Sequence, residues 1–112
     1  MSEANGRYAA LTDRLVDAVL ATPGHTPSEL RRAVLVRAAK PGGANDLPAS
    51  LAAYVDNVAL HAYTVTDGDI AALQRSGSSD DALFEVTVAA ALGAALGRLE
   101  RGLAALRGEE PE

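Results

Sequence analysis

The chain has 112 residues, of which 48% are hydrophobic, and a formal net charge of −5. This length and composition suit one folded domain with a modest core and argue against disorder. The arginines are scattered among acidic residues and form no basic stripe interleaved with aromatic side chains, so we expect no nucleic-acid partner. Because the chain has no cysteine, it holds no disulfide, thiolate metal site or thiol redox centre of its own.

The overall pattern predicts a single all-helical domain over residues 1–112, with 1–6 and 108–112 flexible. The first residues lack the charged, apolar and small-residue order of a secretory signal, so we expect a cytoplasmic location. The sequence contains no phosphate-binding loop, dinucleotide fingerprint, nucleophile elbow or metal-spaced histidine cluster. We therefore expect no cofactor and no metal site.

Two helices are predicted in the first 40 residues. Helical periodicity runs over 8–21, and the Thr-Pro-Gly sequence at 22–24 would end this helix. Thr26 and Glu29 have the spacing of a capping box, which predicts a second helix that continues to about Ala39. The apolar residues expected on the inner face of the first helix are Leu11, Leu15, Val16, Val19 and Leu20.

Two more helices are predicted between residues 48 and 75. The turn-rich segment 40–46 is the best candidate for a flexible loop. Pro48 would open a helix that ends near His61, and residues 61–65 read as a link rather than as an isolated strand. Thr66 resembles the cap of a short helix over 67–75, after which Gly77 is placed to adopt a left-handed conformation.

The last predicted helix, from Ser79 to Arg107, dominates the chain. At 1.5 Å per residue it would be about 43 Å long, longer than the roughly 35 Å diameter of a compact domain of this size. Ser79 and the two aspartates that follow it suit the helix start, and Gly108 would end the helix. Charged residues interrupt its apolar run, so we expect no membrane span; they are Glu85, Arg98, Glu100 and Arg101.

One side of the long helix carries a heptad-like seam with 4-3-4-3-4-3 spacing: Glu85, Ala89, Leu92, Leu96, Leu99, Leu103 and Leu106. Beside the seam, Gly93 and Gly97 lie one turn apart and allow another backbone to approach closely. That backbone could belong to the same subunit, but the length of the helix favours an intersubunit contact. We therefore predict an oligomer interface formed by Gly93, Gly97, Leu99, Leu103 and Leu106.

Three side chains are candidates for acid–base chemistry: Glu85, His61 and Tyr63. Glu85 occupies a seam position, where a carboxylate must be paired, hydrogen-bonded or protonated. The alternative is a structural role, in which Glu85 forms an ion pair with an arginine near the solvent-accessible N-terminal end of the helix. For His61, a packed or capping role is favoured over a catalytic one, and His25 is expected to be solvated in its loop.

The segment from His61 to Leu106 resembles the carboxymuconolactone decarboxylase and alkylhydroperoxidase-D-like superfamily. The resemblance lies in a short helix, a glycine turn, an acidic cap and a long alanine-rich helix, HAYTVTDGDIAALQRSGSSDDALFEVTVAAALGAALGRLERGL. It implies an all-α, five-helix domain of alkylhydroperoxidase-D-like type with a long C-terminal helix, assembled as a trimer or hexamer.

The redox members of that superfamily carry two cysteines, a histidine and an upstream glutamate. The corresponding positions here are Ala62, Val65, Asp69 and Ser50, so none of the four residues matches. The resemblance thus implies a non-redox, oligomeric member that acts as a structural or partner-dependent subunit. A small decarboxylase- or lactone-type enzyme using Glu85, His61 and Tyr63 in an interface pocket, and a helical adaptor that binds a partner protein, are the alternatives.

Overall fold

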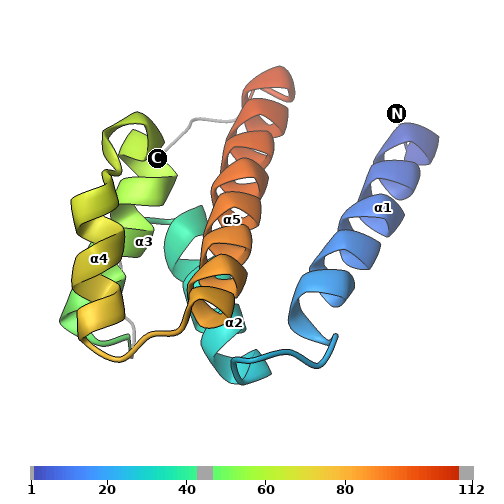
Figure 1. Ribbon diagram of the computed structural model, residues 1–112. Helices are drawn as coiled ribbons and strands as arrows, with labels where there is room; N and C mark the ends of the chain where they lie inside the picture. The colour runs from blue at the N-terminus through green and yellow to red at the C-terminus, as the bar shows by residue number, and fades with distance from the viewer. Residues whose placement is uncertain (1, 43–46, 109–112) are drawn as a thin grey trace.

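A computed structural model describes residues 2–42 and 47–108, without the side chains of residues 2–5 and Tyr63. Within these ranges the chain is all-α, with five α-helices and one short 3-10 turn (Figure 1). The prediction of a five-helix domain with a long C-terminal helix is therefore confirmed. The elements are α1 (Ser2–Leu20), α2 (Ser28–Ala39), α3 (Ala49–His61), η1 (Ala62–Thr64), α4 (Asp67–Arg75) and α5 (Asp80–Leu106).

Helix α5 is the central element of the fold. Its 27 residues span about 40 Å, most of the 48 Å long axis of the molecule. Helices α2 and α3 pack against it and supply the two largest fully buried side chains, Val34 and Val55. The face that α5 turns toward them consists of small and medium-sized residues: Leu83, Val86, Ala89, Ala90, Gly93, Ala94 and Gly97.

The glycine pair of α5 lies directly against α2 of the same chain. A Cβ added at Gly93 would collide with the carbonyl oxygen of Leu35, and one added at Gly97 with that of Ala39. Both glycines are buried, so the two backbones meet with no side chain between them. The expected intersubunit role of Gly93 and Gly97 is thus corrected: the strip is filled by α2, because a helix rich in alanine packs closely on its own neighbour.

Helix α1 begins earlier and is buried less than the sequence suggested. It starts at Ser2 rather than at Tyr8. It runs antiparallel to α5, and Figure 1 shows its N-terminal half diverging from the other helices. Leu20 is buried, but Leu11 and Leu15 are each about half exposed, at 49% and 48%. The amphipathic pattern correctly predicted a helix, but two of the five apolar residues on its expected inner face are left about half exposed by this chain.

The ends of the later helices follow the local signals. Thr66 forms a capping box with Asp69 at the start of α4, and the Ser79 hydroxyl accepts a hydrogen bond from the Ala82 N–H at the start of α5. Gly77 and Gly108 have positive φ angles of 108° and 79°, which suit glycine after a helix end. These predictions are confirmed, whereas part of the predicted loop 40–46 lies outside the described residues.

The predicted capping box of α2 is wrong. Helix α2 begins at Ser28 with Pro27 as its N-terminal flanking residue, and no side chain caps it. The hydroxyl of Thr26 instead donates a hydrogen bond to the Glu85 carboxylate, 59 positions away in the sequence. A long-range charged acceptor therefore takes the hydroxyl that the local pattern assigned to the helix end.

Candidate functional site

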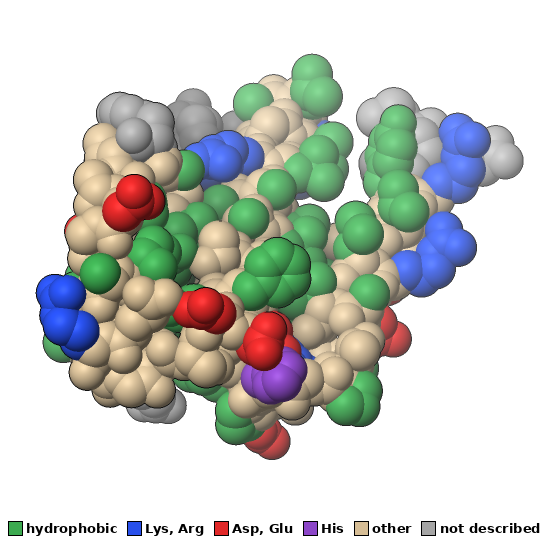
Figure 2. Space-filling model, in the orientation of Figure 1, with side chains coloured by type: hydrophobic (Ala, Val, Ile, Leu, Met, Phe, Trp, Pro, Cys, Tyr) green, Lys and Arg blue, Asp and Glu red, His purple; other side chains and the backbone are tan. Residues whose placement is uncertain are grey.

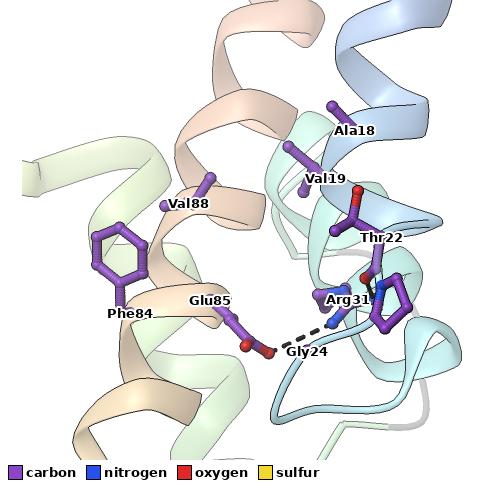
Figure 3. Close-up of a pocket in the computed structure, with 9 residues that line it drawn as sticks. Ala18, Val19, Thr22, Gly24, Arg31, Phe84, Glu85 and Val88 are labelled. Carbon is purple, nitrogen blue, oxygen red and sulfur yellow. Dashed lines mark hydrogen bonds and ion pairs between the residues drawn. The ribbon is translucent and has the colours of Figure 1, made fainter.

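Glu85 lies in the second turn of α5 and is held by the loop between α1 and α2. Its Oε2 accepts a hydrogen bond from the His25 N–H at 2.7 Å. Its Oε1 accepts bonds from the N–H and the hydroxyl of Thr26, at 2.8 and 2.6 Å, and from Nη1 of Arg31 at 3.3 Å. Figure 3 shows Glu85 pointing from α5 toward this loop and Arg31. Both carboxylate oxygens are thus occupied by the fold itself.

Arg31 connects three segments of the chain. Its side chain is only 4% exposed. Nη2 donates to the carbonyl oxygens of Leu20 and Thr22, at 3.0 and 2.7 Å, and Nη1 donates to that of Thr26 at 2.8 Å. These carbonyls lie at the end of α1 and in the following loop, while Arg31 itself lies on α2. The guanidinium therefore fixes how the end of α1 sits on the α2–α5 pair.

The network keeps Glu85 ionised. The Thr26 hydroxyl, the backbone N–H groups of His25 and Thr26 and the Arg31 guanidinium together lower the pKa of Glu85 to about 2, against a smaller opposing effect of burial. Hydrogen bonds donated to a carboxylate favour its charged form. A carboxylate with such a low pKa is a weak proton acceptor at neutral pH, which makes it a poor general base.

A small cavity lies beside the network, between the end of α1 and the start of α5. Its volume is about 190 Å³, below the range of roughly 300–1,000 Å³ that is usual for small-molecule sites. Figure 3 shows apolar side chains from both helices around it and the polar groups at its loop end. The lining residues are Ala18, Val19, Thr22, Pro23, Gly24, Arg31, Phe84, Glu85 and Val88.

The structure does not bring the three predicted acid–base residues together. His61 ends α3, at the opposite end of the bundle from the start of α5 (Figure 1). Nearby, Arg98 Nη2 donates to the Ala59 carbonyl at 2.5 Å, and Arg98 lies thirteen residues beyond Glu85 on α5. This spacing corresponds to about 20 Å along the helix. Tyr63 lies in η1, next to His61, and its side chain is outside the described residues.

Sequence reasoning missed Arg31 and the true partner of Thr26. By composition Arg31 is one of several scattered arginines, yet it lies on the same helical face as the buried Val34 and Ala38. An arginine in phase with a buried face must find acceptors inside the protein, and this phase was the available signal. The structural alternative for Glu85, pairing with an arginine, is the arrangement that the structure shows.

A second feature is the exposed apolar side of α5. Phe84 is 70% exposed, Leu99 46% and Leu106 83%, and Leu103 is partly buried. Figure 2 shows hydrophobic side chains along the visible side of α5 and on the edge of α1 that faces it. The predicted interface residues Leu99, Leu103 and Leu106 therefore keep exposed surface within this chain, whereas α2 buries the glycine pair.

Two further observations concern metals and membranes. Among residues 2–42 and 47–108, no three His, Asp or Glu side chains are grouped so that they could hold a metal ion. Helix α5 is long and apolar enough to cross a membrane by length and composition alone, and 39% of its apolar window is buried against the rest of the molecule. A central helix of a water-soluble bundle meets the same criteria.

Comparisons with protein-family models, with curated proteins and with solved structures found no match. The described residues therefore form a small all-α domain of five α-helices, in which the Arg31–Glu85 network joins α2 and α5 to the end of α1 and the loop that follows it.

Proposed function

We propose that the protein is a non-redox, oligomeric subunit of the carboxymuconolactone decarboxylase-like superfamily, with a structural or partner-dependent role. The observation that carries this proposal is the exposed apolar side of α5, at Phe84, Leu99 and Leu106. Burying one such side chain is worth about 1.5–3 kcal/mol, so a subunit that leaves several in water gains by association.

The family part of the proposal is supported by the helix order and by the resemblance of residues 61–106. The described chain has the short helix, glycine turn, acidic cap and long alanine-rich helix on which that resemblance rests. The redox branch is disfavoured because the chain has no cysteine. The proposal therefore assigns to this chain the helical fold and the oligomeric assembly of the superfamily, without its redox chemistry.

The geometry gives less support to an acid–base enzyme. Glu85 is held by hydrogen bonds from the loop before α2, and His61 ends α3 near Ala59, which bonds to Arg98 about 20 Å from Glu85 along α5. The cavity beside Glu85 is apolar and small. An assembly role needs none of these groups to react, and it uses the surface that the fold leaves uncovered.

The test is the molecular mass of the wild-type protein at micromolar concentration, measured by light scattering coupled to size-exclusion chromatography. We expect an oligomer, with a trimer or hexamer favoured by the resemblance. The double variant Leu99→Glu/Leu103→Glu should then be monomeric, because unpaired charges in a buried contact are strongly unfavourable.

The matched control is Leu60→Glu on α3, where the leucine is 54% exposed and lies outside the α5 surface. This variant should keep the wild-type mass, and circular dichroism should show native helix content in both variants. A monomeric wild-type protein would overturn the assembly role and favour the adaptor alternative. Equal loss of assembly in the Leu60 variant would show that the effect of the double variant is not specific to the α5 surface.

A further inference from the structure

The uncovered side of α5 is a continuous stripe, here called the outer stripe. It consists of Phe84, Val88, Ala91, Ala95, Leu99, Gly102 and Leu106, all exposed and none charged. Positions 84, 95 and 106 are related by steps of 11 residues, as are 88 and 99, and 91 and 102. An 11-residue repeat has about 3.67 residues per turn, close to the 3.6 of a straight helix. The stripe therefore runs almost straight along α5.

The side chains of the outer stripe differ widely in size. Bulky residues stand at its ends, Phe84 and Leu106, and small residues at Ala91, Ala95 and Gly102. A Cβ at Gly102 would meet nothing within 4 Å, so packing inside this chain does not require a glycine there. Glycine in an exposed helix costs about 1 kcal/mol relative to alanine. Close approach of something outside the chain would account for it.

We propose that the occupant of the outer stripe is α5 of a second copy of this chain, antiparallel and related by a twofold axis at Ala95. This inference rests on the proposed oligomeric function and specifies its contact. In this register Val88 lies opposite Gly102 of the second copy, and Ala91 lies opposite Leu99 of the second copy. In both of these pairs a large side chain meets a small one, whereas Phe84 lies opposite Leu106 of the second copy at each end of the contact. The two copies present the same surface to each other, as a twofold contact requires.

The helix dipole and the two carboxylates at the start of α5 favour the antiparallel direction. Asp80 and Asp81 lie in the first turn of α5 and Arg107 follows its last residue. A parallel pair would place the aspartates of both copies together, align the helix dipoles and leave Gly102 facing Gly102.

Helix α1 adds apolar surface to the proposed contact. The outer stripe is about 33 Å long and a helix is about 10 Å wide, so the stripe contributes roughly 330 Å² per copy in projection. A stable interface needs about 800 Å² from each partner. Tyr8, Leu11 and Leu15 of α1 are exposed and apolar. Figure 2 shows hydrophobic side chains on the edge of α1 that faces α5. A twofold contact is also compatible with a hexamer that has both twofold and threefold axes, but not with a simple trimer.

The test uses single cysteines in a chain that has none. Close-packed helix axes lie about 8 Å apart, so the two Cα atoms of position 95 would come within the roughly 4–7 Å that a disulfide spans. Ala95→Cys should therefore give a covalent dimer under mild oxidation, seen on non-reducing gels. The control Ala72→Cys, exposed on α4, should give little.

The relative direction of the two α5 helices is tested with the variants Ala91→Cys and Leu99→Cys. Each variant alone should cross-link poorly, whereas an equimolar mixture should form the dimer, because positions 91 and 99 face each other only in the antiparallel register. Efficient cross-linking of Ala91→Cys with itself would indicate a parallel pair and overturn the proposal.

Two further results separate this inference from the proposed function. An oligomeric wild-type protein in which Ala95→Cys links no better than Ala72→Cys would overturn the α5 pairing and leave the oligomeric function standing. A monomeric wild-type protein would overturn both. Sedimentation of that monomer with phosphatidylcholine–phosphatidylglycerol vesicles would then show that the stripe contacts lipid instead.

Discussion

Arg31 Nη1 and Glu85 Oε1 lie 3.3 Å apart, although 54 positions separate the two residues in the sequence. The pair joins α2 to α5, and the hydrogen bonds that surround it bring in the end of α1 and the following loop. Charge pairing alone would contribute little at a surface. Here the side chain of Arg31 is buried and both of its terminal nitrogens donate hydrogen bonds, so the network determines the position of a whole segment.

The pH dependence of stability should reflect this network. The pKa of Glu85 is lowered to about 2 from an ordinary value of 4.5. In the window between these values the unfolded chain binds more protons than the folded one, so stability falls as the pH falls. We expect the Tm to be nearly constant from pH 8 to pH 5 and to drop steadily from pH 5 toward pH 2.

The variant Glu85→Gln should have a lower Tm at pH 7 and a shallower decline below pH 5. Part of the decline should persist, because the pKa of Asp56 is also lowered, mainly by its hydrogen bonds from Arg37. Calorimetric scans at unit pH intervals would measure both slopes. A Glu85→Gln profile parallel to that of the wild type would contradict the assigned role of Glu85.

Arg31→Lys should destabilise the protein although the charge is retained. Lysine cannot reach the carbonyls of Leu20, Thr22 and Thr26 together, and each buried acceptor left unpaired costs about 1–3 kcal/mol. We expect a loss of about 2–4 kcal/mol in urea titrations. The adjacent Arg32→Lys is the control, since Arg32 is exposed and its replacement should change stability by less than about 0.5 kcal/mol.

Gly93→Ala should separate α2 from α5. The added methyl group would overlap the Leu35 carbonyl oxygen, which belongs to backbone and cannot rotate away. Overpacking of this kind costs about 1–3 kcal/mol or more. Gly6→Ala in α1 has nothing within 4 Å and should be neutral or stabilising by up to about 1 kcal/mol. Equal stability of the two variants would show that the α2–α5 contact is looser than described.

The protein should not reduce peroxides with any dithiol donor, because it has no thiol that could be oxidised and regenerated. A coupled assay with a dithiol and hydrogen peroxide should give the rate of the protein-free blank. Robust turnover by metal-free protein would contradict this expectation.

Local sequence signals allowed the helices to be predicted, whereas the polar network around Glu85 depends on contacts between residues that are distant in the sequence. Thr66 and Ser79 cap the helices that follow them because their acceptors and donors lie within three residues. Thr26 has the same kind of local pattern, but a carboxylate 59 positions away takes its hydroxyl. No periodicity in a single sequence identifies such a distant partner.

The same limit applies to the packing of α5. The pair Gly93 and Gly97 correctly indicated a close backbone approach, but the spacing of two glycines does not say which helix approaches. Leu11 and Leu15 likewise marked a helix face, and sequence alone did not show that this chain would leave the face half exposed.

The close contact of α2 with α5 also affects how the molecule opens. Around Gly93 and Gly97 no side chain separates the two backbones, so water cannot enter by a change of rotamer and the helices must part as rigid bodies. Helix α1 is held mainly near its end, by the Arg31 network. Amide hydrogens in the buried middle of α5 should then exchange with solvent only on global unfolding, while those in the first turns of α1 exchange through local fraying.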